Sequence, residues 1–318
     1  MLTSAAVLFC TASISATTIA HTWVSGSGND NNACTFASPC ATFAGALAKT
    51  SAYGIITAKD AGDFGAVTIA QSVTIDGANM GSITFTSGNG ITVSASANVT
   101  IRNLTINGMG SVKSGISVES GGIVVVDNCI IMNFTLSGIE FYGAGTLTVE
   151  NSRIDSFGAG TYIVGISIDG NAAENVVVRN TVIDASTTSG SNYGFGIDSN
   201  PGPVQASLQN VTVMGAGNGA VVTYSGTTEV TGSVITQSNY GVIAQNGATI
   251  SVASSMITAN TTGVCSNASS KIRLDNNDIY DNPIAIGNCG GIVKTSTTNK
   301  ISGAIAIPAA DISESVTF

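Results

Sequence analysis

Four carboxylates and one tyrosine recur at related positions in the middle of the chain, and they are the side chains best suited to chemistry. Each lies two or four residues after a glycine that precedes an apolar residue: Glu119, Glu140, Tyr142, Asp169 and Asp198. In an extended strand, residues two apart share a face. If these strands lie side by side, the five side chains form one outward acidic surface.

Such a surface permits three interpretations, and the residues alone leave them open. It can be a solvated face of an acidic protein, or it can bind carbohydrate hydroxyls or a calcium ion shared by Glu140 and Asp169. Its carboxylate pairs can also act as the acid and base of a glycosidase. We therefore treat the five residues as a candidate binding face, assign no catalytic residue, and expect no cofactor other than calcium.

The strands that position these residues follow from an internal repeat. Glycine followed by an apolar residue recurs at Gly90, Gly115, Gly138, Gly165, Gly196, Gly219, Gly241 and Gly263. Apolar and polar residues alternate after each pair, and the pattern restarts about every 22 residues, which is typical of short strands wound into a solenoid. The first and third residues after each glycine are expected to point inward.

A second column of the repeat predicts a turn, with the pattern apolar-x-apolar-x-Asn. Its asparagines are Asn103, Asn128, Asn151, Asn180, Asn210 and Asn276. Asparagine tolerates a left-handed backbone and can bond to a neighbouring coil. The outward residues before these asparagines carry opposite charges on neighbouring coils, which predicts the ion pairs Arg102 with Asp127 and Glu150 with Arg179.

This coil pattern resembles the pectate-lyase-type superfold, the right-handed parallel β-helix with an asparagine ladder, across residues 54–300. The resemblance implies an all-β solenoid of about 10 coils. The segment T-W-V-S-G-S-G-N-D and the C-T-F-A-S-P-C loop after it resemble the start of exported bacterial β-helix proteins. Residues 21–53 are therefore expected to hold a first strand at 22–25, a disulfide loop and a short capping helix at 42–49, and residues 301–318 a C-terminal tail or cap.

The cysteines and the first twenty residues predict export. Residues 1–20 resemble a signal peptide, with small residues before a cleavage point after Ala20. Cys34 and Cys40 bracket a short loop, and Cys265 and Cys289 fall one coil apart, so we expect two disulfides. Cys129 is expected to be a buried thiol. The expected location is secreted or at the cell surface.

Charge and motifs limit the functions that fit. The formal net charge is -9, and the 10 Lys and Arg residues never form a run, which argues against nucleic-acid binding. No apolar stretch reaches the ~18 residues of a membrane span. The chain has no N-T-D, G-H-G or R-I-K signature of the polygalacturonase group, and its single histidine is His21. We expect a non-catalytic scaffold that contacts a polysaccharide or a cell surface. The alternative is a polysaccharide lyase or glycoside hydrolase that uses the acidic face.

Overall fold

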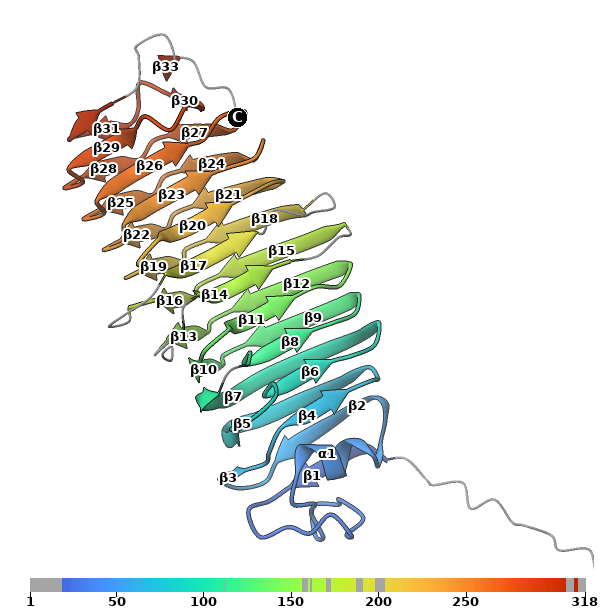
Figure 1. Ribbon diagram of the computed structural model, residues 1–318. Coiled ribbons are helices and arrows are strands. Elements are labelled where there is room, and N and C mark those ends of the chain that lie inside the picture. The colour runs from blue at the N-terminus through green and yellow to red at the C-terminus, as the bar shows by residue number, and fades with distance from the viewer. Residues whose placement is uncertain are drawn as a thin grey trace, which may run out of the picture.

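The computed structural model describes residues 19–111, 113–155, 160, 162–169, 173–186, 191–197, 204–306 and 312–313. These residues form a parallel β-solenoid of about 10 turns, whose strands stack along one axis (Figure 1). The all-β prediction is confirmed: the described residues contain a single short helix, α1 (Phe43–Leu47), which lies at the N-terminal end. The predicted signal peptide lies almost entirely outside the described residues, apart from Ile19 and Ala20, which begin β1 (Ile19–Val24).

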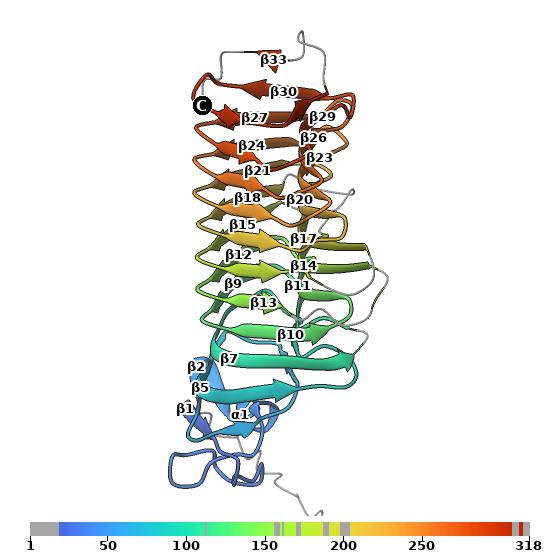
Figure 2. The same ribbon diagram turned by 90° about the vertical axis from the view of Figure 1, so that its left-hand side faces the viewer.

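Two parallel sheets wrap around the core. Sheet A has 22 strands and sheet B has 11 in the described part of the chain. A typical coil has a long strand of sheet A, a bend, a short strand of sheet A, and then a strand of sheet B. Figure 2 shows equivalent strands directly above one another along the axis.

The strand bounds follow this order. The long strands of sheet A are β1, β2 (Thr50–Ala58), β5 (Val73–Thr84), β7 (Ala97–Ser111), β9 (Gly122–Asp127), β12 (Gly145–Glu150), β15 (Glu174–Arg179), β18 (Val204–Gln209), β21 (Thr227–Thr231), β24 (Thr249–Ala253), β27 (Lys271–Asp275), β30 (Ile292–Thr295) and β33 (Ile312–Ser313). The short strands of sheet A are β3 (Gly62–Asp63), β10 (Ile130–Phe134), β13 (Arg153–Asp155), β16 (Val182–Asp184), β19 (Thr212–Met214), β22 (Val234–Thr236), β25 (Met256–Thr258), β28 (Asp278–Tyr280) and β31 (Lys300–Ile301). Sheet B contains β4 (Val67–Ile69), β6 (Ile91–Val93), β8 (Ile116–Val118), β11 (Ser137–Phe141), β14 (Tyr162–Ile168), β17 (Ser191–Ile197), β20 (Gly219–Thr223), β23 (Tyr240–Ala244), β26 (Thr262–Ser266), β29 (Ile284–Gly287) and β32 (Ala304–Ile305).

The core is a continuous stack of aliphatic side chains, as the alternation predicts. On sheet A, Val149, Val178 and Leu208 are register partners on three successive coils and are buried. On sheet B, Ile139 and Ile166 pair in the same way. Each coil therefore completes the burial of its neighbours, and the stack has no boundary at which a second core begins.

The predicted register is wrong at two coils of sheet B. Ile166 pairs with Phe195, so the coil anchored at Gly165 continues at Gly194 and not at Gly196. In the next coil Phe195 pairs with Val221, so Ala220 takes the place expected for Gly219. In the first coil glycine occupies two candidate positions, Gly194 and Gly196, and in the second the anchoring position holds alanine. In both coils the bulky inward side chain, Phe195 or Val221, decides the register.

The asparagine turns are confirmed. The six predicted asparagines all have positive φ, between 49° and 56°. The Nδ2 of Asn128 donates to the Oδ1 of Asn103 at 2.8 Å, and Asn210 donates to Asn180 at the same distance. Gly232 and Ser254 have the same positive φ in two coils that lack asparagine.

One of the two predicted ion pairs is correct. Arg179 contacts Glu150 at 2.7 Å, as expected. Arg102 instead contacts Asp76 at 2.9 Å on the preceding coil. Asp76 is the register partner of Arg102, but glycine follows it instead of asparagine, so the turn pattern did not include that coil.

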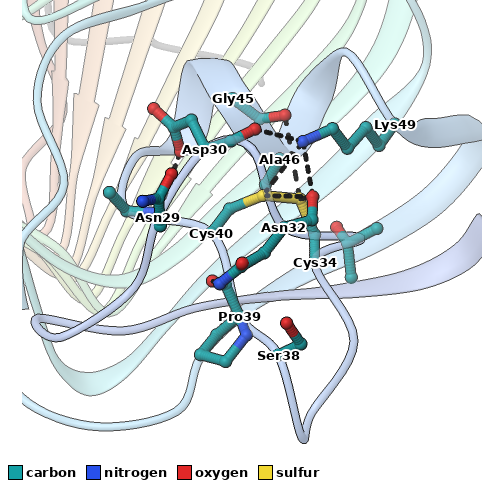
Figure 3. The surroundings of a disulfide bond; sticks show 12 residues. Asn29, Asp30, Asn32, Cys34, Ser38, Pro39, Cys40, Gly45, Ala46 and Lys49 are labelled. Atoms are coloured by element: carbon teal, nitrogen blue, oxygen red, sulfur yellow. Dashed lines mark hydrogen bonds between the residues drawn. A yellow bond between two sulfur atoms is a disulfide. The ribbon is translucent and has the colours of Figure 1, made fainter.

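A stapled loop and the short helix organise the N-terminal end (Figure 3). Cys34 and Cys40 form a disulfide with a Cα–Cα distance of 4.7 Å. The Oγ1 of Thr42 accepts from the amide of Gly45 and caps α1, which buries Phe43 and Ala46. Lys49 donates to the carbonyl of Asn32 at 2.6 Å. The predicted disulfide and the predicted helix are both present.

At the other end, the described residues extend the sheets. Strand β32 pairs with β29, and β33 pairs with β30. Residues 307–311 and 314–318 lie outside the described part, so a capping role for the tail stays a prediction.

The other three cysteines in the described part of the chain also follow the prediction. Cys265 and Cys289 are bridged with a Cα–Cα distance of 5.8 Å, and Cys129 is free and buried. Burial raises the pKa of the Cys129 thiol to about 12. We therefore expect a maleimide to leave Cys129 unmodified in the native protein and to label it after unfolding. Peptide mapping by mass spectrometry checks both states, and a bridge that includes Cys129 would contradict the pairing.

Candidate functional site

The outer face of sheet B brings three of the predicted residues into one column. The amide of Tyr142 donates to the carbonyl of Val118, and the amide of Asp169 donates to that of Phe141. Glu119, Tyr142 and Asp169 therefore follow one another on three adjacent coils, about 4.8 Å apart along the axis. Glu119 and Tyr142 are exposed, so this column is open to a ligand.

Glu140 occupies the neighbouring column and is much less accessible. It pairs in register with Ser117 and Ser167, and its side chain is only 6% exposed. One carboxylate oxygen accepts from Ser114 at 2.9 Å and the other from the Tyr142 hydroxyl at 2.6 Å. Glu140 thus orients Tyr142 and offers little surface of its own.

Partial desolvation of the Tyr142 hydroxyl raises its pKa although the ring is exposed, and the hydrogen bond to Glu140 raises the pKa further. The charges of Glu140, Asp169 and Glu119 raise the pKa of Tyr142 in the same direction. The hydroxyl therefore stays protonated at neutral pH. It can donate a hydrogen bond, but it is a poor proton acceptor.

The structure gives the contacts of Asp169 but leaves the predictions for Asp198 and calcium untested. Asp169 accepts from the hydroxyl of Ser167 at 2.9 Å. Asp198 lies outside the described residues, so its place on this face stays a prediction. Among the described residues, no group of three or more His, Cys, Asp or Glu side chains could hold a metal ion. A calcium ion at Glu140 and Asp169 stays a prediction.

Tyrosines extend this face toward the C-terminal end, and the sequence reasoning missed them. The rings of Tyr162 and Tyr193 lie 5.1 Å apart, and the Nδ2 of Asn218 donates to the Tyr193 hydroxyl at 3.0 Å. Further along, the outward side chains of Val222, Ile243 and Cys265 form a small apolar cluster against which Tyr193, Tyr224 and Tyr240 pack. The shared column of Tyr193 and Tyr240 was the available signal, but it required the correct register of β17.

A buried carboxyl group lies beside the acidic column. Glu174 begins β15 and is only 3% exposed, and neither carboxylate oxygen has a hydrogen-bond partner within the described residues. Burial, and then the charge of Asp169, raise the pKa of Glu174 to about 7. Its register partners are Gly145 and Val204, so the coil below leaves room for its side chain.

A shallow groove of about 270 Å³ lies on the outer face of sheet A, over β15, β18 and β21. Its polar lining consists of Asn175, Gln205, Ser207, Thr227 and Glu229. This groove was also not predicted, because its residues share only their outward orientation and no repeated residue type.

Comparisons with known proteins agree with this geometry. The model of the family described as "Right handed beta helix region" matches residues 24–206 and 193–308, so the chain belongs to that family. Among solved structures, the chain is similar to pectate lyase Pel9A, with 13% identity and a TM-score of 0.54; the match covers 92% of this chain and 79% of the lyase. It is also similar to the A-module of the Azotobacter vinelandii mannuronan C-5 epimerase AlgE4, with 16% identity and a TM-score of 0.58 over 79% and 80% of the two chains.

At these identities the structural similarities establish the fold alone. The predicted pectate-lyase-like β-helix is confirmed. The search of curated proteins gave no match. In the part of the chain that the structure describes, no helix is long and apolar enough to cross a membrane.

Proposed function

We propose that this protein is an exported β-helix scaffold that binds a polysaccharide through the outer face of sheet B and does not cleave it. The observation that carries the proposal is the column of Glu119, Tyr142 and Asp169 at the ends of the sheet B strands, together with the ring pair of Tyr162 and Tyr193 near the starts of those strands. Carboxylates accept hydrogen bonds from sugar hydroxyls, and tyrosine rings offer flat apolar surfaces with a polar end. Within the column, and within the tyrosine pair, neighbouring groups lie one coil apart, which suits a polymer that lies over this face.

Charge points to a neutral polysaccharide. Three carboxylates act on Tyr142, and the chain as a whole carries a net charge of -9. A uronate or sulfated chain would be repelled from this face unless cations intervened. A neutral glycan gains the hydrogen bonds without that cost.

The absence of cleavage is supported by the state of Glu140 and Tyr142, which meet at the acidic column. Both Glu140 oxygens accept hydrogen bonds from Ser114 and Tyr142, and the raised pKa of Tyr142 keeps its hydroxyl protonated. Neither group is prepared to take a proton from a sugar carbon or from water. The two disulfides suit an oxidising compartment outside the cytoplasm.

Affinity electrophoresis through gels that contain neutral polysaccharides tests the binding. We expect one or more of them to retard the protein, and the Tyr142→Ala, Tyr162→Ala double variant to bind about tenfold more weakly, because truncating an interface tyrosine costs more than about 1 kcal/mol. Tyr53→Ala is the matched control, since Tyr53 is 76% exposed on β2, far from this face. Equal retardation of all three proteins would contradict the proposed face.

Mixtures of the protein with the same polysaccharides distinguish binding from the alternative, a carbohydrate-active enzyme. They are incubated and assayed for new reducing ends and for the ultraviolet absorbance of unsaturated uronate products. Either product would contradict the non-catalytic assignment. Repeating the gels with calcium and with a chelator shows whether retardation depends on calcium, which is the outcome expected if Glu140 and Asp169 share an ion.

A further inference from the structure

The basic residues of this acidic protein concentrate at the C-terminal end of sheet A. Four of the 10 lie in residues 271–300: Lys271, Arg273, Lys294 and Lys300. Lys300 contacts Asp278 at 3.1 Å, but the other three make no ion pair or hydrogen bond through their side chains within residues 204–306. They form what we call the C-terminal basic patch, defined as Lys271, Arg273 and Lys294.

Register places two of these cations directly side by side. Arg273 of β27 pairs with Lys294 of β30, while the neighbouring residues Ile272, Leu274 and Val293 are buried. Arg273 and Lys294 therefore point outward on adjacent coils, about 4.8 Å apart along the axis. Lys271 lies two residues before Arg273 on the same strand and shares its face.

The nearest carboxylates on this face offset only part of the positive charge of the patch. On its other side, Arg273 pairs with Ser251, and Glu229 follows one coil further away. Asp275, two residues beyond Arg273, shares this face and accepts from Ser296 at 2.6 Å and from Thr298 at 2.7 Å. These hydrogen bonds lower the pKa of Asp275 and keep it ionised, which leaves the three cations of the patch in excess over one carboxylate.

This arrangement differs from the rest of the sheet. The three earlier outward arginines of sheet A all contact carboxylates: Arg102 and Arg179 contact their register partners Asp76 and Glu150, and Arg153 contacts Asp155 and Asp184. Like charges directly opposite one another on neighbouring strands are destabilising. A bound anion would remove that cost at Arg273 and Lys294.

We propose that the C-terminal basic patch is a binding site for a phosphate group carried by a surface polymer. A phosphate monoester has about 1.5 to 2 negative charges and three acceptor oxygens near neutral pH, which matches two adjacent cations better than a single carboxylate does. Arginine and lysine both bind phosphate through charge-assisted hydrogen bonds. This site lies on sheet A and does not depend on the glycan face of sheet B.

The test compares dextran, carboxymethyl dextran and phosphorylated dextran of matched size by isothermal titration calorimetry with the full protein. We expect the phosphorylated polymer to bind most tightly, and the Arg273→Ser, Lys294→Ser double variant to bind it at least about tenfold more weakly. The control is Lys59→Ser, Lys113→Ser, which changes the net charge equally at distant positions. It should shift the affinity by less than about twofold, since surface charges far from the site act only through screened fields.

Three outcomes would overturn the proposal. Equal binding of carboxymethyl and phosphorylated dextran would show a general polyanion surface, and equal binding of plain dextran would show that the anion is irrelevant. Equal losses of affinity for phosphorylated dextran in the test variant and the control variant would show an effect of net charge alone. Thermal melting separates these results from misfolding, because removing the like-charge pair is expected to leave the melting temperature of the test variant unchanged or higher.

Discussion

Val178→Asp is expected to prevent the solenoid from folding. Val178 is fully buried between Val149 and Leu208 on the coils either side of it, so an aspartate there would place a charge in the continuous core. The cost of an unpaired buried carboxylate is on the order of 5 kcal/mol, comparable with the whole stability of many proteins. The measurement is the circular dichroism spectrum and urea unfolding of the purified variant.

Val177→Asp supplies the matched control, because Val177 is the next residue on β15 and points to the outer face of sheet A. We expect it to shift the free energy of unfolding by no more than about 0.5 kcal/mol. If Val178→Asp unfolded at the same urea concentration as the wild type, the assignment of inward and outward residues would be wrong. If both variants failed to fold, strand β15 would be intolerant of aspartate for a reason other than burial.

Glu174→Gln is expected to stabilise the protein above neutral pH and to change little in acid. Burial, and then the charge of Asp169, raise the pKa of Glu174 from 4.5 to about 7 in the folded state. A raised folded-state pKa means that the unfolded chain loses this proton first as the pH increases. Stability is therefore lost between about pH 4.5 and 7, and the loss reaches about 3 kcal/mol above that range. Glutamine keeps the shape of the protonated acid and cannot ionise.

Urea unfolding of both proteins at pH 4 and pH 8 measures this effect. The free energies of unfolding of the variant and the wild type are expected to be nearly equal at pH 4. At pH 8 the variant's value is expected to be higher by about 3 kcal/mol. Glu150→Gln is the control, since Glu150 is partly exposed and paired with Arg179, and it should give no gain at pH 8. A difference that does not vary with pH would show that Glu174 ionises normally in the folded protein.

The sequence predicted the coil architecture well because each coil repeats the same two signals. The alternation that ends at Asn128 or Asn151 places inward and outward residues correctly, and the structure pairs Val124 with Leu147 as expected. The position of a residue along the axis was harder to predict. The segment G-F-G-I offers both Gly194 and Gly196, and only the inward packing of Phe195 next to Ile166 resolves the choice.

In the candidate site, too, the sequence predicted which residues face outward but not how they pack. Alternation alone placed Glu119, Tyr142 and Asp169 on one outer face, and the structure agrees. It could not show that Glu140 is buried, because that depends on Ser114 and Tyr142 closing over its carboxylate. Nor could it identify Glu174, whose burial depends on the space that Gly145 leaves on the coil below.

The direction of the hydrogen bonds between coils has a mechanical consequence. Successive strands of both sheets pair in parallel, so these bonds run roughly along the solenoid axis. A pull on the two ends would load the coil interfaces in series, and the weakest interface would open first. The Cys265–Cys289 disulfide spans one such interface, between β26 and the segment after β29, and holds it covalently. Under tension, rupture would therefore be confined to interfaces that hydrogen bonds and side-chain packing alone hold together.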